Sequence, residues 1–577
     1  MFSARPTWKT FDYCAARILL IHSALLTILV FRQSLTFDEC GHLPAGISHW
    51  RHQDFTLYGV NPPFVRLVSS FPAAVFMPYE LPAYSAHMEK RSEFYLGARI
   101  ANEVPHFLIY WQIGRLLCVP FSIAGGLICY TWSRRLYGLS AGRAALCLWC
   151  FCPNILGNAC LILPDAPAAA LGVCTCYLFS KWLRCGTWSD STWLGICLGA
   201  TELTKFSWII LYFVLPTALI ASSGINYALL GKLAKLFYSF LLSVWIINVG
   251  YCFEDTCLPL ASNEYLCSQF SGFPIELNTK GNRWVGSTLG MILVPLPKNY
   301  LLGIDLIMYE FERGYWSYLS GELKAGGWWY YYFYGFAVKI PVGLHVLALV
   351  ACGRVLHLIS RRKYDLREVF SLCVALLFVG CASAQTGFSH HFRYVLPALP
   401  FVFIFCSSAF AVGSQSLLVQ AFPRICLAGF ILSSLACFPH SGSYFNEYVG
   451  GPLYGWRHMD GSNIGWGQDE LFLRDWQRRR PNGEAVPLHV QTTGNIDPSL
   501  YGVKCKPVSA FVSGDTAYFP AGWYAISVHE MLRLNSNVLP FLSQKEVDRV
   551  AYSYFIYRLK RPMPVELDLR HEATVID

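Results

Sequence analysis

The chain alternates between long apolar stretches and shorter polar segments over most of its length. Apolar runs of roughly 17 to 25 residues, enough to cross about 30 Å of hydrocarbon, recur from residue 16 to residue 438 and then stop. The predicted spans are 16–34, 112–132, 144–160, 166–182, 192–204, 206–222, 236–252, 334–356, 368–386, 395–412 and 419–438. The pattern therefore predicts a polytopic α-helical membrane protein with about eleven transmembrane helices.

Basic residues in the short loops predict the orientation. Loops on the cytoplasmic side of a membrane carry an excess of Lys and Arg. The loops concerned contain Arg134, Arg135, Arg143, Lys181, Arg184, Lys232, Lys235, Arg354, Arg361, Arg362, Lys363 and Arg367. All of them are cytoplasmic if the N-terminus is. One long span over 192–222 would move Lys232 and Lys235 outside, so we expect two short spans that meet near Lys205.

Composition agrees with a membrane protein and divides the chain in two. Of the 577 residues, 54% are apolar and only 14% are charged, which lies well outside the usage of soluble domains. We expect a transmembrane domain at 1–438 with outer loops 35–111 and 253–333. The segment 439–577 has a helix-like run over 467–480 and the strand-like stretches PLHVQTT and GWYAISVHEML. It therefore predicts a small extracytoplasmic α/β domain. The cytoplasmic Lys and Arg account for the net charge of +9, and no nucleic-acid motif occurs, so we expect no nucleic-acid partner.

Two adjacent acids follow the first span, in TFDECGHLPAG. An ionised Asp38 could take a proton from an acceptor hydroxyl, with Glu39 or His42 orienting it, as a general base requires. The alternative is that Asp38 caps a helix that begins near Glu39. Asn61 lies further along the same outer loop, in YGVNPPFVR, where two prolines predict a rigid turn.

Two further charged residues are predicted at outer span ends. Asp165 lies in LILPDAPAAALG, where it could cap a helix or bind a sugar or a divalent cation. Lys205 lies in LGATELTKFSW, where Glu202 could neutralise it in a buried ion pair. Alternatively, Lys205 could bind a phosphate leaving group, because its compact charge stabilises the negative charge that develops there.

A third group precedes the tenth span, in TGFSHHFRYVLPALPF. His391, Arg393 and Tyr394 are candidate binding residues, since Arg can make two parallel hydrogen bonds to a phosphate. Arg and Tyr are also common anchors at a membrane interface, and both readings remain open.

Taken together, these motifs resemble a known family. The acidic pair, the NPP turn, the PDAP loop, the LTK element and RYVLPALPF follow the order found in membrane glycosyltransferases with the C-type fold. The closest members are the protein O-mannosyltransferases and the bacterial lipid A aminoarabinose transferase. This resemblance covers about three quarters of the chain. Asn61 stands where many relatives have His.

The resemblance implies transfer of a sugar from a polyprenyl-phosphate donor to a lipid, glycan or protein acceptor, with inversion at the anomeric carbon. Asp38 would activate the acceptor with support from Glu39, and Asp165 would position one substrate. Lys205, with Arg393 and His391, would stabilise the departing phosphate.

The resemblance also implies a location and leaves one cofactor open. The reaction would take place at the outer face of a bacterial inner (plasma) membrane, with the C-terminal domain outside the cytoplasm. A divalent metal is left open as a cofactor.

A transporter or flippase for lipid-linked sugars is the alternative function. Such proteins usually have internal repeats and charges near the bilayer midplane. Neither feature is evident in this sequence.

Overall fold

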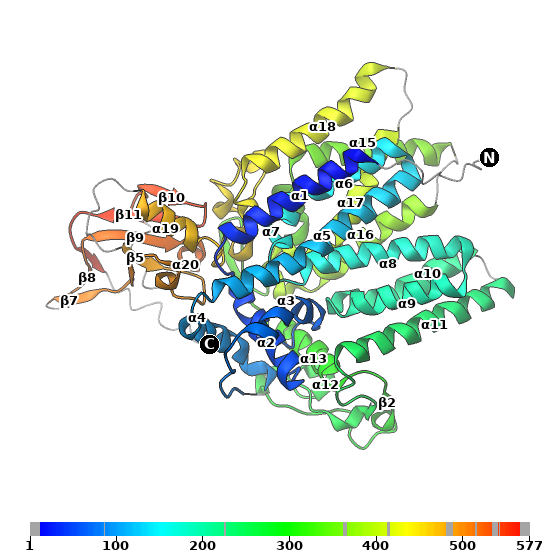
Figure 1. Ribbon diagram of the computed structural model, residues 1–577, viewed down its shortest axis with the longest axis horizontal. Helices are drawn as coiled ribbons and strands as arrows, with labels where there is room; N and C mark the ends of the chain where they lie inside the picture. The colour runs from blue at the N-terminus through cyan, green and yellow to red at the C-terminus, as the bar shows by residue number, and fades with distance from the viewer. Residues whose placement is uncertain are drawn as a thin grey trace.

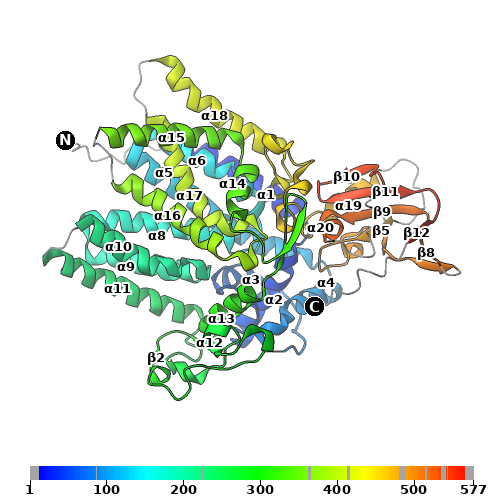
Figure 2. The ribbon, with the colours of Figure 1, turned by 180° about the vertical axis from the view of Figure 1, so that it is seen from behind.

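The computed structural model describes residues 12–85, 87–223, 227–361, 366–411, 416–479, 488–513, 516–533, 541 and 543–565. Long helices lie side by side in one bundle, and a separate sheet-containing unit lies at one end of it (Figures 1 and 2). Shorter helices from two loops cover the bundle at that same end. The long helices therefore form a bundle, and the polar loops gather toward one end of it.

Every predicted span coincides with helical structure. The helices are α1 (Tyr13–Arg32), α5 (Leu108–Tyr137), α6 (Leu139–Cys150), α7 (Pro153–Ala159), α8 (Asp165–Cys185), α9 (Trp188–Glu202), α10 (Leu211–Ser223), α11 (Tyr227–Gly250), α14 (Tyr331–Lys339), α15 (Val342–Ser360), α16 (Leu366–Ala384), α17 (Leu399–Ser407) and α18 (Leu417–Ala436). The break expected near Lys205 is present, between α9 and α10.

Three predicted spans are interrupted. The segment 144–160 forms α6 and α7, which meet at a bend of 56°. Pro341 precedes α15 and separates it from α14. Residues Phe392–Ala398 form a 3-10 helix before α17. Proline lacks an N–H group and its ring crowds the preceding turn, so it often kinks or ends an α-helix. This agrees with the break at Pro341 and with Pro153 at the start of α7.

Only some of the helices are both long enough and apolar enough to cross a membrane as a single helix. Within the described ranges, six helices are long and apolar enough to do so, or seven if the bent pair α6–α7 is one span. The protein is therefore a multi-pass membrane protein. The predicted total of about eleven spans stays a prediction.

The two outer loops contain short helices and hairpins. The first loop forms α2 (Phe37–His52), α3 (Phe64–Phe76) and α4 (Ser92–Glu103). The second forms the short strands β1 (Leu258–Pro259) and β2 (Leu293–Val294), the helices α12 (Ser268–Ser271) and α13 (Lys298–Arg313), and the hairpin β3 (Trp316–Leu319) and β4 (Glu322–Ala325).

The C-terminal segment folds into an α/β unit. Its mixed sheet has the order β10-β11-β9-β5-β6, in which β5 pairs in parallel with β6 and β9. The strands are β5 (Leu488–Gln491), β6 (Cys505–Pro507), β9 (Gly522–Ser527), β10 (Asp548–Val550) and β11 (Tyr554–Leu559). A second sheet joins β7 (Phe511–Ser513), β8 (Thr516–Phe519) and β12 (Met563–Val565). The predicted helix over 467–480 is α19 (Glu470–Arg478), and the predicted strand GWYAISVHEML is β9 followed by α20 (Val528–Leu532).

This C-terminal segment is hydrogen-bonded to the chain just before α2. The backbone amides of Ser34 and Phe37 donate to the carbonyl oxygens of Gln468 and Trp466, at 3.0 Å and 2.8 Å. The Ser34 hydroxyl lies 2.5 Å from Glu470 Oε2 and 2.8 Å from the carbonyl oxygen of Gly467. Segments more than 400 residues apart in sequence are thus joined directly.

Glu470 is buried at this junction. Burial raises the pKa of its carboxyl from 4.5 to about 7, and hydrogen bonds from Ser34 and Thr492 oppose the shift. A protonated Glu470 can donate to the Ser34 hydroxyl, which can then donate to Gly467. The folded state therefore holds this proton more tightly than the unfolded state. The stabilisation is complete below pH 4.5 and is lost as the pH rises through about 7.

A Glu470→Gln variant should remove this pH dependence, because an amide NH₂ group donates to Ser34 without titrating. Between about pH 5 and pH 8, we expect the unfolding free energy of the wild type to fall relative to the variant by roughly 2 to 3 kcal/mol. Thermal unfolding of both proteins in detergent at several pH values measures this difference. A difference that is constant over the range would contradict it.

Candidate functional site

Four charged residues predicted from the sequence meet in one cluster. Arg393 donates from Nη2 to Asp38 Oδ2 at 2.6 Å and from Nη1 to Asp165 Oδ2 at 3.3 Å. Lys205 Nζ donates to Asp165 Oδ1 at 2.6 Å. These four residues, called the Arg393 cluster below, alternate acid and base and have a net charge of zero when all are ionised.

Each member of the Arg393 cluster comes from the end of a helix. Asp38 lies in the first turn of α2, and Asp165 begins α8. Lys205 lies in the turn after α9, and Arg393 lies in the 3-10 turn before α17. Asp38 is the most exposed of the four, with 21% of its side chain accessible against 13% or less for the others. The cluster is therefore open to solvent mainly at Asp38.

Aromatic rings surround the two cations. The Arg393 guanidinium lies 4.2 Å from the centre of the Trp466 ring and 5.4 Å from that of Tyr394. Lys205 Nζ lies 4.8 Å from the centre of the Tyr394 ring. Cations are attracted to the negative faces of such rings. Tyr394 therefore lies at the Arg393 cluster, and its role in binding stays a prediction.

Both cations keep hydrogen-bond donors that the two acids do not use. Among the described residues, Arg393 Nε has no hydrogen-bond partner although it is buried. An ammonium group has three donors, and Asp165 takes one of those of Lys205. An anion that reaches the cluster would therefore find donors of both residues.

Lys205 does not pair with Glu202. The Glu202 carboxylate instead accepts from the Tyr300 hydroxyl at 3.4 Å. One expectation from the sequence was a local ion pair between Lys205 and Glu202. The chain turns after Glu202, where α9 ends, and the Lys205 side chain pairs with Asp165 instead.

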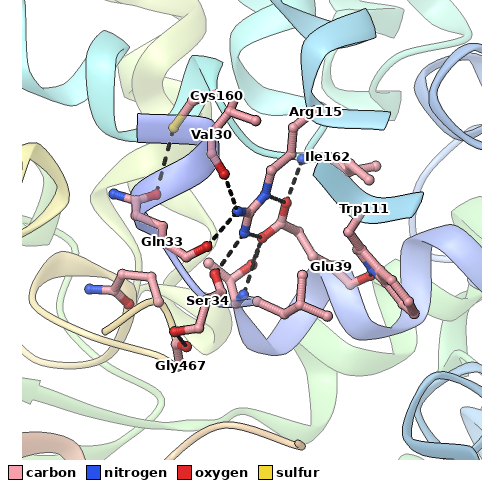
Figure 3. Close-up of polar contacts among 12 residues, drawn as sticks. Val30, Gln33, Ser34, Glu39, Trp111, Arg115, Cys160, Ile162 and Gly467 are labelled. Atoms are coloured by element: carbon pink, nitrogen blue, oxygen red, sulfur yellow. Dashed lines mark hydrogen bonds and ion pairs between the residues drawn. The ribbon is translucent and has the colours of Figure 1, made fainter. Parts of the chain in front are cut away.

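Glu39 belongs to a different network from its neighbour Asp38. Its two carboxylate oxygens accept from Arg115 Nε and Nη2, both at 2.7 Å, and one also accepts from the backbone amide of Ile162 at 2.9 Å (Figure 3). The backbone amide and hydroxyl of Thr36 donate to Glu39 as well, at 3.1 and 2.9 Å. Thr36 is the N-cap of α2, and the acid that completes this cap is Glu39 and not Asp38. Glu39 is fully buried and holds the start of α2 in place.

The partner that orients Asp38 is Arg393, not Glu39 or His42. His42 is buried and stacks on Tyr58, with 3.9 Å between ring centres. Burial, together with the nearby guanidiniums of Arg66 and Arg393, holds the pKa of His42 well below its usual range. His42 is therefore neutral at pH 7.

Asn61 contributes to this region through its backbone. Its carbonyl oxygen accepts from Arg66 Nη2 at 2.9 Å. The NPP turn thus holds the side chain of Arg66, which lies in the first turn of α3.

His391 lies between the cluster and the C-terminal segment. Its Nδ1 is 2.9 Å from the hydroxyl of Ser462, and the amide of Phe392 donates to Asn463 Oδ1 at 3.0 Å. Burial is the main reason that the pKa of His391 is well below its usual value, and His390 and Arg393 add to the shift. His391 is therefore neutral and is positioned by the C-terminal segment.

Two residues at the site were not predicted. Arg115 lies inside a predicted span, where an ionisable residue is in itself a sign of function or of a buried partner. That signal was available in the sequence. Trp466 lies more than 70 residues from Arg393, and no local pattern indicates that the two residues touch.

The donor set at the cluster suits an anion more directly than a metal. Within the described part of the chain, no group of three or more His, Cys, Asp or Glu side chains is arranged to hold a metal ion. The oxygens of Asp38 and Asp165 face Arg393 and Lys205.

A separate hollow of about 190 Å³ lies between the two outer loops and includes none of the cluster. Its lining residues include Glu89, Glu254, Lys280, Lys298 and Asp305. Several of these charges are already paired, for example Lys280 with Glu89 at 2.9 Å. The convergence of charges predicted from the sequence lies at the Arg393 cluster and not in this hollow.

Comparisons with known proteins find matches among solved structures. No family model matches the chain, and a search of curated proteins finds no match. Among solved structures, ArnT from Cupriavidus metallidurans bound to undecaprenyl phosphate is 11% identical, with a TM-score of 0.45, covering 96% of this chain and 98% of that one. The oligosaccharyltransferase from Archaeoglobus fulgidus is 12% identical, with a TM-score of 0.45, covering 82% of this chain and 59% of that one. Any function of this chain has to follow from its own residues.

Removing Glu39 should destabilise the fold. A Glu39→Gln variant leaves the buried Arg115 charge without its anion, and we expect a loss of about 3 to 5 kcal/mol in unfolding free energy. Replacing both residues, as in Glu39→Leu with Arg115→Met, should recover part of that loss because no buried charge remains. Thermal unfolding of the two variants in detergent checks this. Equal stability of wild type and Glu39→Gln would contradict the structural role.

Proposed function

We propose that this protein is an inverting glycosyltransferase. It would move a sugar from a polyprenyl-phosphate donor to a hydroxyl of a lipid, glycan or protein acceptor at the outer face of a bacterial plasma membrane. The observation that carries the proposal is the Arg393 cluster. It places an accessible carboxylate beside two cations, and the four residues come from helix ends that lie far apart in sequence.

Asp38 is proposed as the general base. A hydroxyl nucleophile has to lose its proton as it attacks, and a positioned carboxylate can take that proton. Arg393 fixes one carboxylate oxygen of Asp38 through a 2.6 Å hydrogen bond. The accessible part of Asp38 remains for the acceptor. Glu39 would act through position alone, since it holds the start of the helix that carries Asp38.

Lys205 and Arg393 are proposed to stabilise the leaving group. A phosphate gains negative charge as its bond to the sugar carbon breaks, and fixed cations lower the energy of that state. The unused donors of Lys205 and Arg393 would bind the phosphate oxygens, while Asp165 holds both cations in place. Inversion follows from attack by the acceptor on the face of the sugar opposite the phosphate.

The donor class follows from the surroundings of the cluster. The chain has no Gly-rich nucleotide-binding motif, so an activated sugar on a nucleotide has no evident binding element. A lipid carrier instead reaches helix ends from within the membrane. The charges lie at helix ends and not in mid-helix, which favours an enzyme over a transporter.

An Asp38→Asn variant should abolish transfer while the protein still inserts and folds. The matched control is Asp190→Asn, which removes an ion pair with Lys181 at the opposite end of α9 from Lys205. Mass spectrometry of glycans, lipids and envelope proteins is compared for cells that lack the chain, express it, or express each variant. We expect one class to lose a hexose or pentose without the chain and with Asp38→Asn, but not with Asp190→Asn. Full modification by Asp38→Asn would remove Asp38 from the role of base.

A Lys205→Gln variant should lower turnover by about 10² to 10³ and weaken retention of the polyprenyl phosphate product. The reason is that Gln keeps a hydrogen bond to Asp165 but supplies no charge to the phosphate. Native mass spectrometry of the purified protein with polyprenyl phosphate measures retention, and a donor-consumption assay measures turnover. Unchanged binding together with unchanged turnover would exclude Lys205 from the phosphate site.

A further inference from the structure

The second outer loop presents an apolar face that the Arg393 cluster does not use. This face is formed by exposed aliphatic side chains that follow closely on one another in sequence. They are Val285, Leu289, Met291, Ile292 and Leu293. Met291, with 76% of its surface exposed, is the most accessible of them. We call this group the 285–293 face.

The 285–293 face continues a row of exposed side chains on α11. Leu241, Trp245 and Val249 recur every four residues on that helix and are exposed, so they lie on one side of it. Phe253 extends the row beyond the helix, with its ring centre 6.4 Å from that of Trp245. Since α11 is one of the helices long and apolar enough to cross a membrane, we expect this row to face lipid.

Hydrogen bonds place the loop level with the last turn of α11. Asn248 in that turn donates from Nδ2 to the carbonyl oxygen of Pro295 at 3.0 Å, and its Oδ1 accepts from the Thr256 hydroxyl at 2.6 Å. Both views show the loop around β2 folded back beside the outer end of α11 (Figures 1 and 2). The loop that carries the 285–293 face is thus held beside the end of α11.

The backbone of the loop is suited to a membrane interface. Leu258 and Pro259 pair with Val294 and Leu293 in a small antiparallel ladder, and the amide of Leu260 donates to the carbonyl oxygen of Ile292 at 3.0 Å. Unpaired peptide groups are costly at a membrane, and here several are paired. Charged side chains are also present in this loop, including Lys298, whose Nζ is 3.6 Å from Asp255.

We propose that the 285–293 face inserts into the outer leaflet of the bilayer and anchors the second outer loop there. Aliphatic side chains that are otherwise exposed to water are then buried among acyl chains, as in interfacial membrane-binding segments. A second copy of the chain or another protein could cover the same face. Continuity with the lipid-facing row of α11 favours lipid. This membrane contact does not depend on which reaction the Arg393 cluster performs.

Site-specific photo-crosslinking tests this anchor in the full chain. A diazirine amino acid replaces Met291 in protein reconstituted into phosphatidylethanolamine and phosphatidylglycerol vesicles, and mass spectrometry identifies the adducts after irradiation. Val249, in the lipid-facing row, is the positive control. Val512, equally exposed on strand β7 of the C-terminal unit, is the negative control.

We expect phospholipid adducts at Met291 with a yield similar to that at Val249 and several-fold above that at Val512. Adducts mainly to another polypeptide at Met291 would show that protein covers the face. A phospholipid yield no higher than at Val512 would show that water covers it. Either result would overturn the proposal. All three positions are exposed, so none of the substitutions should disturb folding.

Discussion

The buried charge of Arg115 constrains the end of the bundle at which the polar loops gather. A guanidinium inside a helical membrane domain needs an anion and hydrogen-bond acceptors, since burying a bare charge is costly. Arg115 obtains these from Glu39 and from the carbonyl oxygens of Val30, Gln33 and Ser34. These contacts fix the end of α1 and the start of α2 against α5. Because successive residues of a helix point about 100° apart, directing Glu39 toward Arg115 directs Asp38 to another side.

Arg393 forms ion pairs with two acids, Asp38 and Asp165. Asp38 and Asp165 come from α2 and α8 and would repel each other without a cation between them. The alternation of acid and base keeps the group near neutrality, which makes its partial burial tolerable. An added anion would share each cation with a carboxylate and would bind through the donors that the two acids leave unused. The cluster is thus assembled with its cations already positioned, so little rearrangement is needed at binding.

From the sequence, the four residues of the Arg393 cluster were expected at span ends that face the same side of the membrane. Asp38, Asp165, Lys205 and Arg393 were placed on one side by span parity and basic loops, and the structure brings them together. What the sequence could not predict is the direction of each side chain around its helix. The pairing of Glu39 with Arg115 therefore appeared only in the structure.

Contacts between segments that lie far apart in the chain could not be predicted from the sequence either. Trp466 reaches Arg393, and Gln468 reaches Ser34, through packing of a C-terminal unit whose docking leaves no periodic signal. The kinks in 144–160 and 334–356 were missed although prolines lie at or near them. A hydropathy window averages over such breaks, since the residues on both sides remain apolar.

The contacts between residues 34–37 and 466–470 also impose an order on biosynthesis. The first outer loop leaves the ribosome more than 400 residues ahead of the segment that completes it. At about 5 to 20 residues per second, this delay amounts to tens of seconds. Throughout that interval, Ser34 and Phe37 lack their native partners. The newly inserted bundle therefore waits in an unfinished form, and a chain that terminates before residue 466 never acquires its mature outer surface.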